Sequence, residues 1–97
     1  MASVPFVMRR MLKTCQSEER LPSDEEFAAY KPAYKEALQA ARELGGSDPL
    51  DDIGEWAVAW TKERGQLPTP QQFRKHTRKI LIDRGIEVPE DSILANR

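Results

Sequence analysis

The side chains best suited to acid–base or nucleophilic catalysis occur once each in this sequence. His76 is the only histidine and Cys15 the only cysteine among 97 residues. His76 stands in a basic stretch, where a solvent-facing histidine is expected more often than a general base. Cys15 falls on the apolar face of a predicted N-terminal helix, where a buried, inert thiol is the ordinary outcome. Because no nucleophile, base and oxyanion donor come together, we assign no catalytic residues and do not expect an enzyme.

Acidic residues gather between Asp48 and Glu55, and such a cluster can bind a metal ion. Asp48, Asp52 and Glu55 would share one face of a helix. The spacing is not that of a calcium loop, however, and no glycine stands where such a loop makes its sharp turn. The helix dipole alone favours acids at a helix N-terminus. A single cysteine also cannot build a cysteine-based zinc site, so we expect neither a metal nor a cofactor.

Basic side chains concentrate in the segment 70–85. Five basic residues stand there against one acid, a net charge of +4, whereas the whole chain carries −1 and the remainder therefore −5. Residues at spacing four lie in rows along a helix, and the segment offers two adjacent cationic rows. They would neutralise phosphates without reading base sequence. The alternative is that acids of other helices pair with these cations inside the fold. The candidate nucleic-acid-binding residues are Arg74, Lys75, Arg78 and Lys79.

Large aromatic side chains supply a second candidate surface. Core packing is the default expectation for tryptophan and tyrosine at helical spacing. A chain of 97 residues has little core to spare, so we expect some of this apolar area to remain exposed. Exposed apolar area of this kind marks the interface with a protein partner or with a second copy of the chain. The candidate partner-interface residues are Trp56, Trp60, Tyr30 and Tyr34.

The composition is that of a single globular domain. The hydrophobic fraction is 39% and the charged fraction 32%, which is lean in apolar residues but not disordered. The longest apolar run is far shorter than the roughly 18–20 residues that cross a bilayer. Basic residues interrupt the N-terminal segment, which lacks the pattern of a signal peptide. We expect a cytoplasmic protein that does not bind membranes.

Capping signals predict four helices. Their starts are Ser3, the capping-box string Ser23–Glu26, Asp48 followed by a proline, and a second capping box at Thr69–Gln72. Glycines at positions 45–46, 65 and 85 are expected to end the last three helices. Apolar residues recur three and four positions apart in each segment, which is typical of helices that share one core.

Two features are expected to depart from regular helix. Pro32 stands inside the second predicted helix, where it cannot donate a hydrogen bond and disfavours helix at Lys31. We expect a kink there, or a split into two short helices. Residues 86–97 contain Pro89 and are expected to form a short extended tail.

An internal similarity suggests how the helices pair. Leu-Pro-Ser-Asp-Glu-Glu-Phe at 21–27 resembles Leu-Pro-Thr-Pro-Gln-Gln-Phe at 67–73, and each string joins two predicted helices. Duplication and independent use of the same capping chemistry both account for it. We predict one all-α domain, 1–97, in which two tandem helical hairpins, 1–46 and 47–97 with the tail, form a small bundle.

Elimination leaves two expected functions. The first is a protein-interaction module or small oligomeric structural protein, whose partner the sequence does not identify. The alternative is a nucleic-acid-binding accessory or regulatory protein that uses the basic fourth helix. The nucleic-acid alternative depends on whether the basic side chains of that helix are paired with acids of other helices within the fold.

Overall fold

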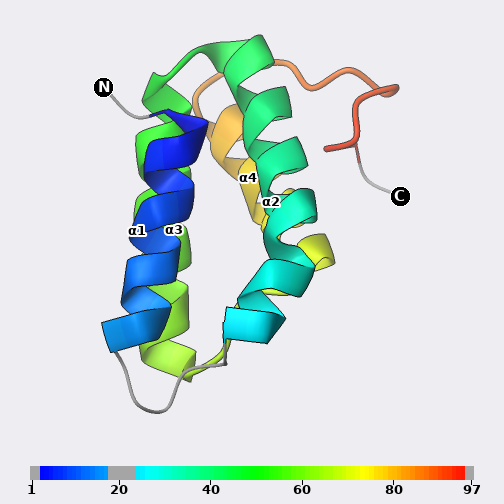
Figure 1. Cartoon of the computed structure of the whole chain (residues 1–97). Coiled ribbons are helices and arrows are strands. Elements are labelled where there is room, and N and C mark those ends of the chain that lie inside the picture. Colours follow the sequence, from blue (N-terminus) through cyan, green and yellow to red (C-terminus); the bar gives the residue numbers. More distant parts are fainter. Residues whose placement is uncertain (1–2, 18–23, 96–97) are drawn as a thin grey trace.

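The computed structural model of the chain describes residues 3–17 and 24–95, which form four helices and no strand. These are α1 (Val4–Ser17), α2 (Asp24–Gly45), α3 (Asp48–Arg64) and α4 (Pro70–Asp83) (Figure 1). The predicted all-α fold with two helical hairpins is confirmed. Among the described residues, no helix is long and apolar enough to cross a membrane.

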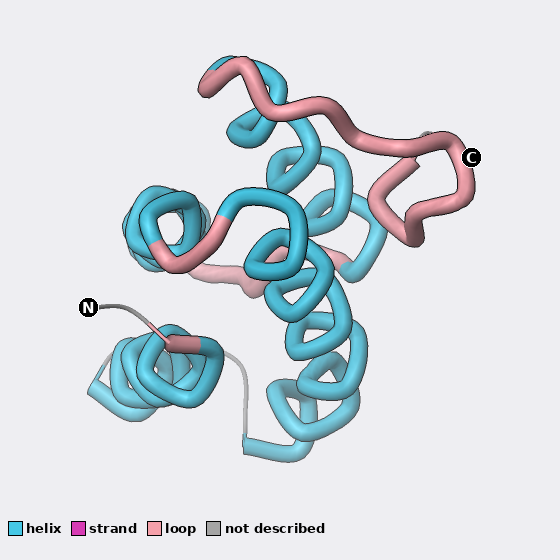
Figure 2. Tube along the Cα trace, turned by 90° about the horizontal axis from the view of Figure 1, so that it is seen from above, coloured by secondary structure: helices cyan, strands magenta, loops and turns pink. Residues whose placement is uncertain are grey.

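The two hairpins stack on each other in the same orientation. In Figure 1, α1 and α2 form the front layer, α3 lies behind α1 and α4 lies behind α2. The most extensive contacts accordingly join α1 to α3 and α2 to α4, and α2 also contacts α3. Figure 2 shows the same two layers from above. This arrangement is that of consecutive two-helix repeats in a solenoid, in which equivalent helices lie side by side.

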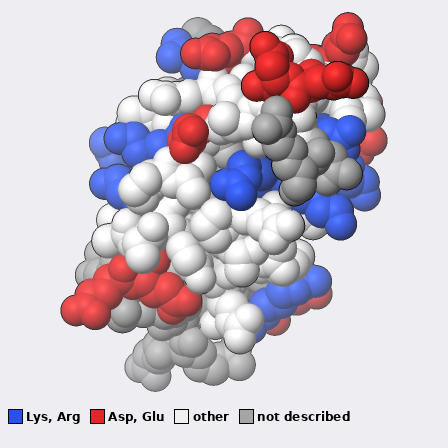
Figure 3. Space-filling view, turned by 90° about the vertical axis from the view of Figure 1, so that its right-hand side faces the viewer, with Lys and Arg blue, Asp and Glu red and all other residues white. Residues whose placement is uncertain are grey.

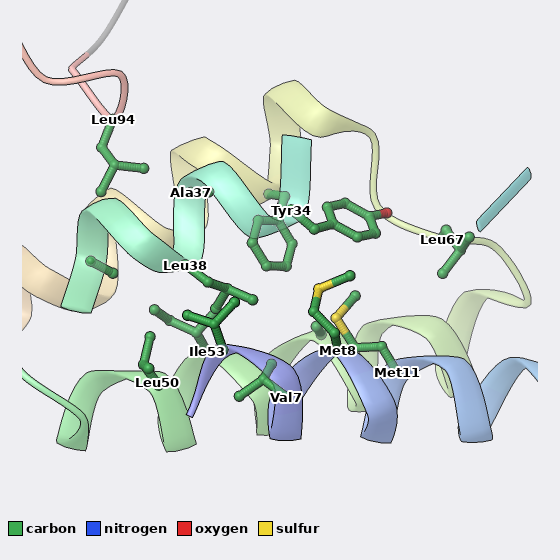
Figure 4. Close-up of a cluster of buried hydrophobic side chains, with 14 of the residues drawn as sticks. Val7, Met8, Met11, Tyr34, Ala37, Leu38, Leu50, Ile53, Leu67 and Leu94 are labelled. Atoms are coloured by element: carbon green, nitrogen blue, oxygen red, sulfur yellow. The ribbon is translucent and has the colours of Figure 1, made fainter. Parts of the chain in front are cut away.

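The core lies between the two layers and draws on every helix. Its largest fully buried apolar side chains are Val7, Met11, Tyr34, Leu38, Leu50, Ile53, Phe73, Leu81 and Leu94. Figure 4 shows several of them converging from α1, α2 and α3, with Leu94 reaching in from the tail. The spacing of three and four predicts a buried face in the first helix that includes Val4, Met8, Met11 and Leu12, and one in the second made of Phe27, Tyr30, Tyr34, Ala37, Ala41 and Leu44. Most of these side chains are buried, and Val7 and Leu38, which lie outside the predicted faces, are fully buried as well.

The helix ends follow the capping chemistry of the sequence where the structure describes them. Thr69 and Gln72 form the predicted capping box, each side chain accepting a hydrogen bond from the other residue's backbone N–H. Gly85 ends α4 with a φ of 78°, and the Ile86 N–H donates to the Leu81 carbonyl at 2.9 Å, as in a Schellman motif. The predicted capping box at Ser23 lies outside the described residues.

Three details differ from the sequence-based expectation or refine it. The helix α3 begins at Asp48 itself, so that Ser47, not Asp48, is the N-cap. Pro32 does not split α2, which runs without a break from Asp24 to Gly45, and Figure 1 shows that its axis is bowed. A proline removes one hydrogen bond and bends a helix without having to end it. The tail has no regular structure from 86 to 95, as expected, and Leu94 anchors it in the core.

A glycine allows α1 and α3 to approach closely. Gly54 is buried in the middle of α3. A Cβ atom at this position would lie 3.3 Å from Cγ1 of Val7, tighter than ordinary van der Waals contact. A side chain larger than that of alanine at Gly54 would therefore push the two helices apart.

Tyr34 ties the first hairpin to the second. Its side chain is 0% exposed, and its hydroxyl donates a hydrogen bond to the carbonyl of Pro68 in the turn before α4. Figure 4 shows this hydroxyl directed at the turn beside Leu67. The ring of Tyr34 also packs on that of Phe73, with 4.5 Å between the ring centroids. One α2 residue thus holds both the turn and the first part of α4.

Replacing Tyr34 with phenylalanine should destabilise the protein without changing its fold. The Pro68 carbonyl would lose a buried donor, and an unsatisfied buried acceptor costs about 1–3 kcal/mol. Urea unfolding followed by circular dichroism measures this loss. The matched control is Tyr30→Phe, because Tyr30 is half-buried and its hydroxyl makes no hydrogen bond among the described residues. Equal stability of the two variants would contradict a structural role for the Tyr34 hydroxyl.

Candidate functional site

The helix α4 presents its predicted cations on its outer face. Phe73, Thr77 and Leu81 point into the core, and the capping box fixes the first turn. Because 3.6 residues complete a turn, Lys75 and Lys79 lie on the side of the helix opposite to these three, and Arg74 and Arg78 lie between the two sides. Lys75 and Lys79 are exposed, and Arg74 and Arg78 are half-exposed. We call the surface formed by Arg74, Lys75, Arg78 and Lys79 the α4 basic face.

No residue of the α4 basic face takes part in a salt bridge within the described parts of the chain. Arg84, the C-cap residue that follows α4, is paired: its guanidinium donates to the Asp52 carboxylate of α3. Glu36 of α2 lines a shallow hollow with Arg74 and Arg78 but forms no salt bridge with them. Internal pairing, the alternative expected from sequence, thus occurs for Arg84 but for none of the four residues of the α4 basic face among the described residues.

Figure 3 views the side of the molecule on which α2 and the tail lie. Lys and Arg side chains form a band across the middle of this side. Asp and Glu gather at its upper end and at its lower left. At the upper left and lower right of this side, basic and acidic side chains lie next to each other, so charge is segregated only in part on it. A cationic patch can nevertheless produce a local field although the chain carries a net charge of −1.

An aromatic cluster borders the α4 basic face on the side of α3. The rings of Trp56 and His76 are stacked, with centroids 4.3 Å apart, and Trp60 lies 5.4 Å from Trp56. The Arg64 guanidinium stands over the Trp60 ring, 3.7 Å from its centroid, a cation–π contact. Both tryptophans are half-buried, so the expectation that the small core leaves them partly uncovered is confirmed.

His76 therefore joins the cationic and aromatic parts of this surface. Burial against its neighbours lowers the pKa of His76 below its ordinary value of 6.5, and the positive charges of Lys79, Lys75 and Arg64 lower it further. A protonated His76 imidazole would be repelled by these three cations, and its charge would be poorly solvated. The neutral imidazole is consequently the form that the fold favours near neutral pH.

The two tyrosines of the predicted partner interface do not belong to this surface. Tyr34 is fully buried, so it cannot contact a partner in this fold. Tyr30 is half-buried on α2 and packs on Tyr34, with 6.0 Å between the ring centroids. It connects to the tryptophans only through the buried rings of Tyr34 and Phe73. Of the four predicted residues, Trp56 and Trp60 remain together as a candidate surface.

Two participants, Arg64 and His76, were not among the candidate site residues predicted from sequence. Arg64 lies one helical turn after Trp60, so the spacing of four could have predicted their contact. His76 was noted only as a surface histidine, because its position against Trp56 depends on how α3 and α4 pack. No group of three or more His, Cys, Asp or Glu side chains within the described residues could hold a metal ion. The side chain of Cys15 lies outside the description.

The pKa of His76 should be directly measurable, since it is the only histidine. We expect its NMR titration to have a midpoint below 6.5 and to shift upward in Lys79→Gln. The unfolded chain should take up a proton at higher pH than the folded chain, so the free energy of unfolding should fall as pH drops below 6.5. In His76→Gln this part of the pH dependence should vanish. A midpoint above 6.5 would contradict the described packing.

Comparison with known proteins gives no match to this chain, neither to a protein family, nor to a curated protein, nor to a solved structure.

Proposed function

We propose that this protein binds nucleic acid through the α4 basic face. The observation that carries the proposal is that four cations stand on one side of one helix without a salt bridge among the described residues. Like charges four positions apart destabilise a helix slightly. A phosphate backbone would relieve this repulsion and release condensed counterions at the same time.

The chemistry of the face favours binding that is independent of base sequence. Lysine and arginine supply point charges and forked donors for phosphate oxygens. Within the part of the chain that the structure describes, the amide that borders the face and could read adenine is that of Gln71. Acids lie beyond the end of the face, with Asp83 bordering a hollow that also contains Asp52 and Glu55. The contact should therefore be short and should involve a few phosphates.

Binding should weaken steeply with salt. If about four phosphates are neutralised, affinity should fall on the order of 100-fold between about 50 and 200 mM salt. Fluorescence anisotropy of a labelled mixed-sequence duplex and of a single strand measures this dependence. The double substitution Arg74→Glu with Arg78→Glu should abolish binding, since it removes two contacts and adds two repulsive charges.

A matched control separates the α4 basic face from a general effect of charge. Lys31→Glu with Lys35→Glu makes the same change in net charge, also four positions apart on an exposed helix face, but on α2. This variant should bind nearly as the parent does. Absence of binding at low salt, or equal loss in both double variants, would refute the assignment.

The second candidate function is that of a protein-interaction or oligomeric structural module. It is supported by the incomplete cover of Trp56 and Trp60, both of which are half-buried. Paired tryptophans with an adjacent arginine are typical of interface hot spots. The occupant we consider for this surface is a second copy of the chain.

Self-association through this surface should give a mass in solution that is a multiple of 11.1 kDa. Sedimentation equilibrium at high micromolar concentration measures it. Trp60→Ala should return the protein to a monomer, because it removes the exposed ring while leaving Trp56 packed on Phe73. A parent protein that stays monomeric under these conditions excludes the second candidate.

A further inference from the structure

A groove with an apolar floor runs between α1 and α2 on the front of the molecule. Its floor consists of Met8 and Leu12 of α1 and Phe27 of α2. Pro5 closes the groove toward the start of α1. The groove encloses about 270 Å³. It does not include the α4 basic face or the tryptophans, so it is a separate surface.

The stacking of the hairpins explains why this groove is open. On the inner side of α1 and α2, the second hairpin packs against both helices. On the outer side, toward the viewer in Figure 1, no helix of the described chain covers them. In a longer stack of two-helix repeats this is where the last helix of a preceding repeat would pack. The groove therefore has the geometry that receives a helix.

The rim of the groove is cationic. Arg9 stands on the α1 side, and Lys31 and Lys35 follow each other at spacing four on the α2 side. All three are exposed, and none forms a salt bridge among the described residues. Among the residues that the structure describes, no acidic side chain lines the groove. The groove thus has an apolar floor between positive charges that have no salt bridge among the described residues. A helix with an apolar stripe flanked by negative charges would be complementary to it.

We propose that the α1–α2 groove binds an acidic amphipathic helix of a protein partner. Apolar residues at i, i+3 or i+4, and i+7 of that helix would lie over Met8, Leu12 and Phe27, which is the helix-in-groove mode of recognition. Glutamate or aspartate on both sides of the stripe would pair with Arg9, Lys31 and Lys35. A basic or uncharged helix would leave these cations unpaired or repelled, so the rim selects the partner by charge. This surface is independent of the proposed nucleic-acid binding.

Two synthetic peptides test the proposal on the full chain. Each is about 18 residues long, five turns of helix, with leucine at i, i+3, i+4 and i+7 positions. One carries glutamate beside the stripe, and the other carries lysine at the same positions. Isothermal titration calorimetry should show binding of the glutamate peptide and at least about 10-fold weaker binding of the lysine peptide.

A charge swap in the protein supplies the specificity control. Lys31→Glu with Lys35→Glu should weaken the glutamate peptide at least about 10-fold and should bring the lysine peptide into the groove. Both lysines are exposed, so the variant should fold as the parent does, and circular dichroism checks this. Arg74→Glu with Arg78→Glu is the matched variant on α4, and it should leave peptide binding unchanged.

Several results would overturn the proposal. It fails if neither peptide binds, if both bind equally, or if the groove variant keeps its affinity for the glutamate peptide. It also fails if a single-stranded oligonucleotide displaces the peptide, since the acidic helix would then be using the α4 basic face. Loss of self-association in the groove variant, without peptide binding to the parent, would assign the groove to a second copy of the chain.

Discussion

The stacking of the two hairpins depends above all on the buried contact that Tyr34 makes across them. Tyr34 belongs to α2, yet its hydroxyl binds the carbonyl of Pro68 and its ring packs on Phe73. The first contact places the turn that leads into α4, and the second fixes the rotation of α4 about its own axis. Once Phe73 faces inward, helical geometry directs the neighbouring positions 74, 75, 78 and 79 outward. The α4 basic face is therefore a consequence of how this tyrosine is buried.

The same stacking decides which surfaces remain open. Equivalent helices of the two hairpins lie side by side, so each hairpin covers one face of the other. The missing Cβ at Gly54 lets Val7 approach and keeps the two layers close. The outer side of α1 and α2 has no such neighbour in the described chain. There the half-buried Leu12, with the edges of the buried core residues Met8 and Phe27, forms the floor of the groove. An open groove and a compact core thus have one structural cause.

The helices of this chain can be predicted from interactions between residues close in sequence. Which side chains lie at the centre of the core depends on how the helices pack against one another. The cap at Thr69 and the stop at Gly85 each depend on residues within one turn, and both are confirmed. Val7 and Leu38 stand beside the predicted stripes but are fully buried, because a helix that meets two neighbours buries a face wider than one stripe. Tyr34 was predicted at a partner interface for a related reason. Helical spacing places its ring on one face of the helix, but it does not tell whether another helix of the same chain or another protein covers that face. The sequence alone also could not decide between a kink and a split at Pro32, and α2 runs without a break through this residue.

The positions of the charged side chains can be predicted from helical spacing, whereas their salt bridges depend on how the helices pack. Spacing predicts two cationic rows on α4. Only the packed structure shows that Asp52 of α3 pairs with Arg84 and that, among the described residues, the α4 basic face has no salt bridge. The net charge of −1 averages over this face and the cationic rim between α1 and α2. The two surfaces differ in one respect, since the groove has an apolar floor and the α4 basic face is a row of charges along a helix. A nucleic acid backbone gains from charge alone and has no apolar stripe to fill the groove, whereas an acidic amphipathic helix gains from both terms. Both partners are anionic, so the cations alone would not distinguish between them. The apolar floor of the groove would select the acidic helix, and the α4 basic face, a row of charges, would bind the nucleic acid.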